Sequence, residues 1–261
     1  MPTRVLLPLS LLLLALVALL ALASGKLWLN PFGLAEEGWQ RVILWEIRLP
    51  RVLLAMAVGA VLGLSGAALQ GMLRNPLADP SIIGVSACAA FGAVIALYTG
   101  LASLAWFVLP LGGMLGASLS VLLVYLLAGQ RSSLFSLILA GMAINAFVGA
   151  LISLVLNVAS NPFAMSEIVY WLLGSFANRG MPDVVASVPF MAAGSVIVLA
   201  CGRYLNALSL GEETAASLGY GSPRWRWLLV AGVACSVGAA VSVGAAPALA
   251  RAATTVPEVG L

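Results

Sequence analysis

Long stretches without a single charged side chain limit the folds open to this sequence. An α-helix needs about 20 residues to cross a hydrocarbon core of about 30 Å. Six charge-free runs are long enough: Val5–Gly25, Val52–Leu73, Pro80–Gln130, Ser132–Ser166, Val184–Gly202 and Trp227–Ala250. Only 8% of all residues are charged, whereas soluble domains carry about 25%. The sequence therefore predicts an integral membrane protein.

The run from Pro80 to Gln130 is too long for one crossing, and we expect it to break at residues 98–100. Seven spanning helices are predicted, at about 5–24, 52–73, 82–99, 103–128, 134–158, 184–202 and 227–247. Lone strands would leave backbone amides unpaired in lipid, and no alternating pattern indicates a barrel. The predicted fold class is an all-α, polytopic helical bundle.

The first charge-free run has two interpretations. Arg4, the apolar stretch after it and the small residues 21–24 resemble a signal peptide. The stretch is long for such a peptide, so a retained membrane helix is favoured. Arginine and lysine divide evenly between the two sides of the predicted bundle, so charge alone does not fix its orientation.

Several functional classes lack the residues they need. The chain contains no histidine, which excludes a histidine ligand or proton relay within it. Cys88, Cys201 and Cys235 lie in apolar runs without metal-site spacing, so we expect small packed side chains and no metal site. The net charge of +3 comes without a basic cluster and predicts no nucleic-acid partner.

Small residues recur every four positions in the second predicted span. Such a stripe lets helix backbones approach closely in lipid, where hydrophobicity no longer drives association. The sequence therefore predicts a helix-packing face on this span. Its residues are Gly59, Gly63, Ala67 and Gly71.

A second stripe, in the fifth predicted span, is polar as well as small. Its residues are Gly141, Asn145, Gly149, Ser153 and Asn157. Polar groups at membrane depth face either a bundle interior or an aqueous cavity. Hydrogen bonding between helices and the lining of a transport pathway both remain open from this pattern.

Two connections carry recognisable helix signals. In the first, Asp79 is placed to cap a helix that has Pro80 at its first position. In the second, residues 203–226, Ser209 and Glu212 fit a capping box and Gly219 a helix stop. The second connection is predicted to form a short helix outside the bilayer.

Four ordered motifs resemble one known family. They are "RLPRVLLAMAVGAVLGLSGAALQGMLRNPLADPSIIGVSACAAFGAVIAL" (48–97), "LILAGMAINAF" (137–147), "YWLLGSFANR" (170–179) and "LGEETAASLGYGSPRWR" (210–226). Together they are similar to the FecCD-type permease subunits of binding-protein-dependent ABC importers. Relatives of this type import iron-siderophores, haem or vitamin B12. The resemblance covers about residues 1–247.

The resemblance implies a ten-helix, type II importer permease at the bacterial plasma membrane, with the N-terminus in the cytoplasm. It implies three partners: a second permease copy or paralogue, a dimer of cytoplasmic ATPase subunits and an extracytoplasmic substrate-binding protein. The chain has no G-x-x-x-x-G-K-[ST] phosphate loop. ATP is therefore expected in the partner, no cofactor is expected here, and the chain itself is not an enzyme.

The resemblance also assigns roles to residues. In relatives, arginines of the "RLPR" motif meet glutamates of the docked binding protein, which indicates Arg48 and Arg51 here; the alternative is that both anchor the helix at the interface. Ser133 and Ser136 match the cytoplasmic gate region, and the stripe from Gly141 to Ser153 becomes a pathway face. The segment that matches the ATPase-coupling helix includes Leu210, Gly211, Glu212, Glu213, Ala216, Leu218 and Gly219.

The chain departs from the family after the seventh predicted span. Relatives continue with a G-x-I-x-F-V-G-L segment, a P-H motif and three further spans. Residues 248–261 do not resemble the family, so we expect an incomplete permease domain at 1–247 followed by an unrelated tail. The alternatives to an importer subunit are a secondary transporter and a non-transporting membrane assembly protein.

Overall fold

The computed structural model describes residues 3–25, 38–129, 133–159, 162–176 and 179–244, and every regular element within them is a helix. The order is α1 (Thr3–Ala23), α2 (Gly38–Val42), η1 (Ile43–Arg48), α3 (Leu49–Leu73), η2 (Pro80–Ile83), α4 (Val85–Tyr98), η3 (Leu101–Ser103), α5 (Val108–Ala128), α6 (Leu134–Val158), α7 (Pro162–Leu172), α8 (Met181–Ala200), α9 (Gly202–Ser209), α10 (Glu212–Ala215), η4 (Ala216–Tyr220) and α11 (Pro223–Ser242). The tail 248–261 lies outside the described residues.

The predicted all-helical membrane bundle is confirmed, but the third predicted span is shorter than expected. Six helical stretches of the described chain are long and apolar enough to cross a membrane. In place of the predicted span 82–99 stands α4, whose 14 residues rise only about 21 Å. The helix begins late because Gly84 has φ +79°, a left-handed conformation that glycine adopts at little cost. Asp79 caps the separate turn η2 as predicted, accepting from the Ser81 backbone N–H.

The second predicted span is longer than expected. Helices α2, η1 and α3 run together as 36 residues, Gly38–Leu73. Pro50 lies inside this helix and has no N–H to donate to the preceding turn. The chain accommodates it with the π-helical turn η1 just before α3, a common device where the helical ladder is interrupted.

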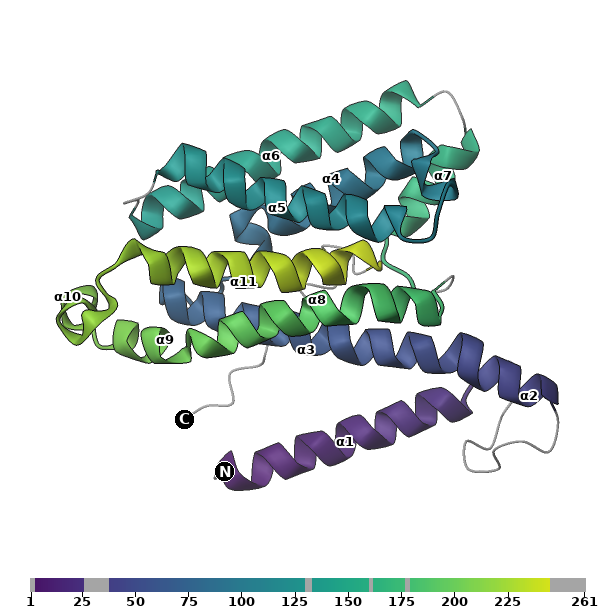
Figure 1. Cartoon of the computed structure of the whole chain (residues 1–261), viewed down its shortest axis with the longest axis horizontal. Coiled ribbons are helices and arrows are strands. Elements are labelled where there is room, and N and C mark those ends of the chain that lie inside the picture. The colour runs from purple at the N-terminus through teal and green to yellow at the C-terminus, as the bar shows by residue number, and fades with distance from the viewer. Residues whose placement is uncertain (1–2, 26–37, 130–132, 160–161, 177–178, 245–261) are drawn as a thin grey trace.

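Helix α11 forms the centre of the bundle. It packs most closely against α8 and α5 and also contacts α3 and α4, while α6 packs on α4 and α5 (Figure 1). Its inward residues Leu229, Val233 and Val237 have no exposed surface. By contrast, α1 touches the bundle near one end only; 6% of its spanning window is buried, against 67% for α11.

Glycines bring α4 and α5 into backbone contact. A Cβ added at Gly116 would lie 2.0 Å from the Cys88 carbonyl oxygen, and one at Gly92 would lie 2.1 Å from that of Gly112. No side chain fits at either position without moving a helix. Small residues thus allow the short α4 to sit directly on α5, as expected for helices that associate in lipid.

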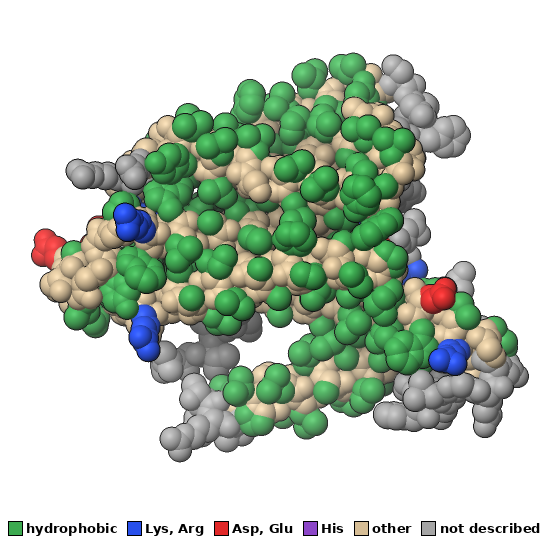
Figure 2. Space-filling model, viewed as in Figure 1, with side chains coloured by type: hydrophobic (Ala, Val, Ile, Leu, Met, Phe, Trp, Pro, Cys, Tyr) green, Lys and Arg blue, Asp and Glu red, His purple; other side chains and the backbone are tan. Residues whose placement is uncertain are grey.

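Charge is confined to the two ends of the visible face. Figure 2 shows hydrophobic side chains across its middle, with Lys, Arg, Asp and Glu only near α10 at one end and near α2 at the other. The apolar band is the surface expected to meet lipid. The chain is therefore a multi-pass membrane protein whose polar segments project at both ends.

We predict that Gly116→Ala lowers the free energy of unfolding by about 1–3 kcal/mol, the usual cost of overpacking. Gly59→Ala is the matched control, because a Cβ there meets nothing within 4 Å. The measurement is urea unfolding of the purified chain in detergent micelles. Equal stability of the two variants would contradict the close α4–α5 contact.

Candidate functional site

The segment predicted to couple to an ATPase projects from one end of the bundle (Figure 1). Its core contact is Ala215, which is 2% exposed, whereas Leu210 and Leu218 are 67% and 57% exposed. Gly219, with φ +91°, ends the helical geometry as the sequence predicted. The segment therefore presents apolar side chains to the outside while the small residue Ala215 packs against the bundle.

The predicted capping box at Ser209 and Glu212 is wrong. Ser209 ends α9 and its hydroxyl donates back to the Asn206 carbonyl. Gly211, at φ +121°, is the residue that precedes α10. The left-handed glycine separates the two helices, so the serine cannot cap the second one. Glu212 and Glu213 still occupy the first turn of α10, where carboxylates favour the helix dipole.

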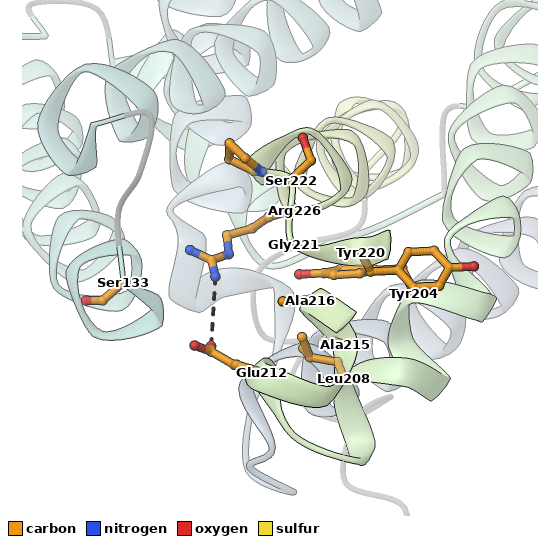
Figure 3. Close-up of a pocket in the computed structure, with 11 residues that line it drawn as sticks. Ser133, Tyr204, Leu208, Glu212, Ala215, Ala216, Tyr220, Gly221, Ser222 and Arg226 are labelled. Atoms are coloured by element: carbon orange, nitrogen blue, oxygen red, sulfur yellow. Dashed lines mark ion pairs between the residues drawn. The ribbon is translucent and has the colours of Figure 1, made fainter. Parts of the chain in front are cut away.

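A cavity of about 600 Å³ lies beside this segment and joins it to the predicted gate (Figure 3). Ser133 lies on one side of the cavity and α10 on the other. Arg226, from the first turns of α11, points across it toward Glu212, with 3.9 Å between Nη2 and Oε1. The lining residues are Ser133, Tyr204, Leu208, Glu212, Ala215, Ala216, Tyr220, Gly221, Ser222, Pro223 and Arg226.

Sequence reasoning did not identify the aromatic residues behind this cavity. The ring centroids of Tyr204 and Tyr220 lie 6.2 Å apart, and those of Tyr220 and Trp225 lie 5.3 Å apart. They link α9, η4 and α11 in one aromatic row. The alternating "RWRW" at 224–227 was the available signal, since neighbouring residues on a helix face different partners.

The predicted gate serines form a helix start. Ser133 caps α6 by accepting from the Ser136 backbone N–H at 3.1 Å, and the two hydroxyl oxygens lie 3.0 Å apart. Arg74 stabilises the same end of the bundle by donating to the Leu208 carbonyl. This contact ties the end of α3 to α9, next to the coupling segment.

The polar stripe of α6 divides into two parts. Gly141 is covered by η2, where an added Cβ would lie 2.1 Å from the Ile82 carbonyl oxygen. Asn145 donates from Nδ2 to the Ser81 carbonyl. Gly149 and Ser153 are exposed instead, with the Ser153 hydroxyl donating to the Gly149 carbonyl of its own helix.

The first part therefore bonds to a neighbouring element, and the second part leaves a polar face open on the bundle surface. Asn157 continues this open face, with its amide donating to the Ser153 carbonyl at 2.8 Å.

Arg48 and Arg51 lie well inside the long helix and not at its start, because the helix begins at Gly38. Arg48 is half-buried and donates from Nη1 to the carbonyls of Leu22 and Ala23, at 2.8 and 2.9 Å. These carbonyls end α1 and have no partner within it. Arg48 thus holds the end of α1 against the bundle, a role that the sequence did not reveal.

In the described part of the chain, most of the small-residue stripe of α3 is uncovered, and only its Gly71 end lies near another helix, α9. An added Cβ at Gly59 or Gly63 meets nothing within 4 Å, and one at Gly71 meets only Leu205 at 3.8 Å. Ala67 on the same stripe is also exposed. The opposite face of α3, with Leu54, Leu62 and Leu69, is the one buried in the bundle.

The known proteins that resemble this chain in sequence include three that are described as permease proteins. The "Uncharacterized ABC transporter permease protein YvrB" of Bacillus subtilis is 39% identical over 204 residues, covering 76% of this chain and 57% of that protein. The molybdate import system permease protein MolB of Haemophilus influenzae is 36% identical over 231 residues, covering 84% and 68%. The vitamin B12 import system permease protein BtuC of Salmonella paratyphi A is 37% identical over 241 residues, covering 91% and 72%.

A solved structure matches as well. A chain described as part of a metal-chelate type ABC transporter in an inward-facing conformation aligns with a TM-score of 0.77 and 33% identity. The alignment covers 92% of this chain and 75% of that one. The chain thus spans little more than half to about three-quarters of the length of the proteins it matches.

One family model agrees with these relatives. It is that of the FecCD transport family, and it matches residues 12–246, nearly the whole described bundle. The chain belongs to the FecCD transport family.

Proposed function

We propose that the chain is the permease subunit of an ATP-driven ABC importer. The observation that carries this proposal is the segment 210–219, which projects with exposed leucines from an otherwise apolar bundle. Relatives described as import-system permeases for vitamin B12 and molybdate support it. ATP is bound and hydrolysed by a separate ATPase dimer, and a second permease copy or paralogue completes the conduit.

The substrate we propose is a metal chelate of the iron-siderophore, haem or cobalamin type. The solved relative is described as a metal-chelate type transporter. Growth of a host that lacks its own permease, on a single iron or cobalamin source, tests which chelate is moved. Failure on every such source would contradict the substrate class and leave the importer assignment to the tests below.

The orientation we propose places the start of α1 and the coupling segment in the cytoplasm. Both lie at the same end of the bundle, and α2 lies at the other (Figure 1). An extracytoplasmic binding protein would then approach the end that carries α2. This arrangement puts the ATPase contact and the binding-protein contact on opposite sides of the membrane.

We predict that Leu218→Asp weakens co-purification of the co-expressed ATPase subunit at least tenfold, because a buried apolar anchor at an interface is worth about 2 kcal/mol. Leu104→Asp is the matched control: Leu104 is 74% exposed but belongs to the turn between α4 and α5. Pull-down at several ATPase concentrations gives the measurement. Co-purification that survives deletion of residues 210–219 would contradict the coupling role.

Binding-protein docking is the role we propose for Arg51. Its guanidinium group can grip a carboxylate with two hydrogen bonds and stays protonated. The contacts of Arg48 with the end of α1 mean that its reversal would disturb the bundle as well. Arg51 also makes contacts within the chain, so its test includes a variant that keeps the charge.

We predict that Arg51→Glu weakens docking of the substrate-loaded binding protein by at least tenfold, while Arg51→Lys retains part of it. Surface plasmon resonance at low and moderate salt provides the affinities. Arg41→Glu, an exposed arginine of α2, is the charge-matched control. If the Arg51→Glu variant docked the binding protein at low salt as tightly as the unchanged chain, Arg51 would not belong to the docking interface.

The open polar face of α6 is our proposed pathway surface. Gly149, Ser153 and Asn157 expose small or polar groups on a spanning helix, where lipid contact would be costly. If a substrate path ran between two permease copies, the water in it would solvate these three residues. Gly141 and Asn145 would support this face through η2 and not line the path.

In a chain whose three cysteines are replaced, we predict that Ser153→Cys reacts with a membrane-impermeant maleimide at least ten times faster than Leu154→Cys. Both side chains are exposed in the single chain. A difference between their labelling rates therefore reports which of the two faces water in the assembled transporter. The assay uses membrane vesicles that contain the whole complex. Equal protection of both cysteines would place Ser153 against lipid.

A further inference from the structure

Helices α5 and α11 form a V that opens toward the end of the bundle that carries α10. In the half that lies farther from α10, the two helices approach each other closely, since an added Cβ at Gly238 would lie 2.3 Å from the Ala117 Cβ. Toward the other end the side chains become larger. There Tyr125 and Trp227 meet edge to face with centroids 5.0 Å apart, and the helices diverge (Figure 1).

An open groove of about 520 Å³ lies between α5 and α11 where they diverge. Its floor is apolar and faces out of the bundle, with Val121, Leu122 and Ala231. The mouth is polar and aromatic, with Tyr125, Arg224 and Trp227. One groove therefore combines a cation at one end with a hydrocarbon surface at the other.

The two aromatic residues indicate where the groove lies in the membrane. Tryptophan and tyrosine concentrate at the level of the lipid headgroups. Trp227 and Tyr125 flank Arg224 in the groove, so the arginine lies at headgroup level. Ala231, seven residues further along α11, lies about 10 Å deeper, among the acyl chains.

The charge of Arg224 is available to a ligand. Its side chain is exposed, and within the described part of the chain no carboxylate lies within 4.0 Å of it. Two other arginines near this end have partners within the chain: Arg226 pairs with Glu212, and Arg74 donates to the Leu208 carbonyl. The start of α11 adds the positive end of a helix dipole beneath Arg224.

We propose that this groove binds an anionic phospholipid from the leaflet on the α10 side. The phosphate pairs with Arg224, the glycerol region covers Tyr125 and Trp227, and one acyl chain follows Val121, Leu122 and Ala231. Basic pockets between membrane helices on the cytoplasmic side are suited to acidic headgroups. A free phosphate would leave the apolar floor unused.

Lipid binding in this groove requires only that the chain lies in a membrane and does not require transport. The lipid proposal can therefore fail while the importer proposal holds, and the importer proposal can fail while lipid binding holds.

The test uses the purified full chain in neutral detergent, titrated with phosphatidylglycerol or phosphatidylcholine that carries brominated acyl chains. Bromine quenches nearby tryptophan fluorescence. We expect half-maximal quenching at about fivefold less phosphatidylglycerol than phosphatidylcholine, since one arginine near a membrane surface contributes about that factor. Trp227→Phe removes the quenched component and so identifies the site.

Arg224→Gln is expected to abolish the preference between the two lipids. Arg203→Gln, which removes an exposed arginine of α9 at the same end of the bundle, leaves the preference intact. Ala231→Phe fills the floor and weakens quenching by both lipids. Ala231 is exposed, so this change does not disturb the core.

Four results would overturn the proposal. The two lipids could quench equally in the unchanged chain, or Arg203→Gln could act as strongly as Arg224→Gln. Millimolar inorganic phosphate could displace phosphatidylglycerol, which would indicate an anion site without a lipid chain. Ala231→Phe could leave lipid quenching unchanged and split a dimer of the chain, which would make the groove a contact between copies.

Discussion

Close approach of helix backbones is the constraint on which the rest of the bundle depends. In lipid, apolar side chains gain little by leaving one hydrocarbon surface for another, so association relies on van der Waals contact and hydrogen bonds. Gly92 and Gly116 give α4 and α5 that contact, and Gly238 gives it to α5 and α11. Helix α11 can then sit at the centre, with α5 and α8 on either side.

The short helix α4 follows from the same constraint. Its 14 residues do not span the membrane, so its ends need partners inside the protein. At one end the turn η2 rests on Gly141, and Asn145 of α6 donates to the Ser81 carbonyl. A polar side chain at membrane depth thus completes the backbone hydrogen bonding of a turn. This contact also fixes the direction in which the rest of the stripe on α6, Gly149 and Ser153, is presented.

The fold class and several helix ends could be predicted from the sequence because their causes are local. Charge-free runs determine which segments lie in lipid, and Asp79 with Pro80 defines a helix start whatever surrounds it. Gly219 ends the coupling segment for an equally local reason. The order of motifs carried the family resemblance, and the family model over residues 12–246 confirms the family.

The features that the sequence did not predict depend mostly on residues that are brought together only by the fold. Arg48 bonds to carbonyls 25 and 26 residues earlier, and Asn145 to one 64 residues earlier. Gly84 shortened a predicted span because a single glycine can either continue a helix or reverse its handedness. The pairing of Arg226 with Glu212 required the chain to turn back after η4. No spacing rule in the sequence encodes these encounters.

The tether between Arg48 and the end of α1 has a consequence for biogenesis. The first helix leaves the ribosome before its partner arginine has been made, and almost all of its apolar surface is left uncovered by the described residues. Its first residence in the bilayer therefore rests on lipid partitioning. The two hydrogen bonds can then fix its position as soon as Arg48 has followed, 25 residues after Ala23, so the earliest segment to be inserted has its anchor before most of the chain has been made.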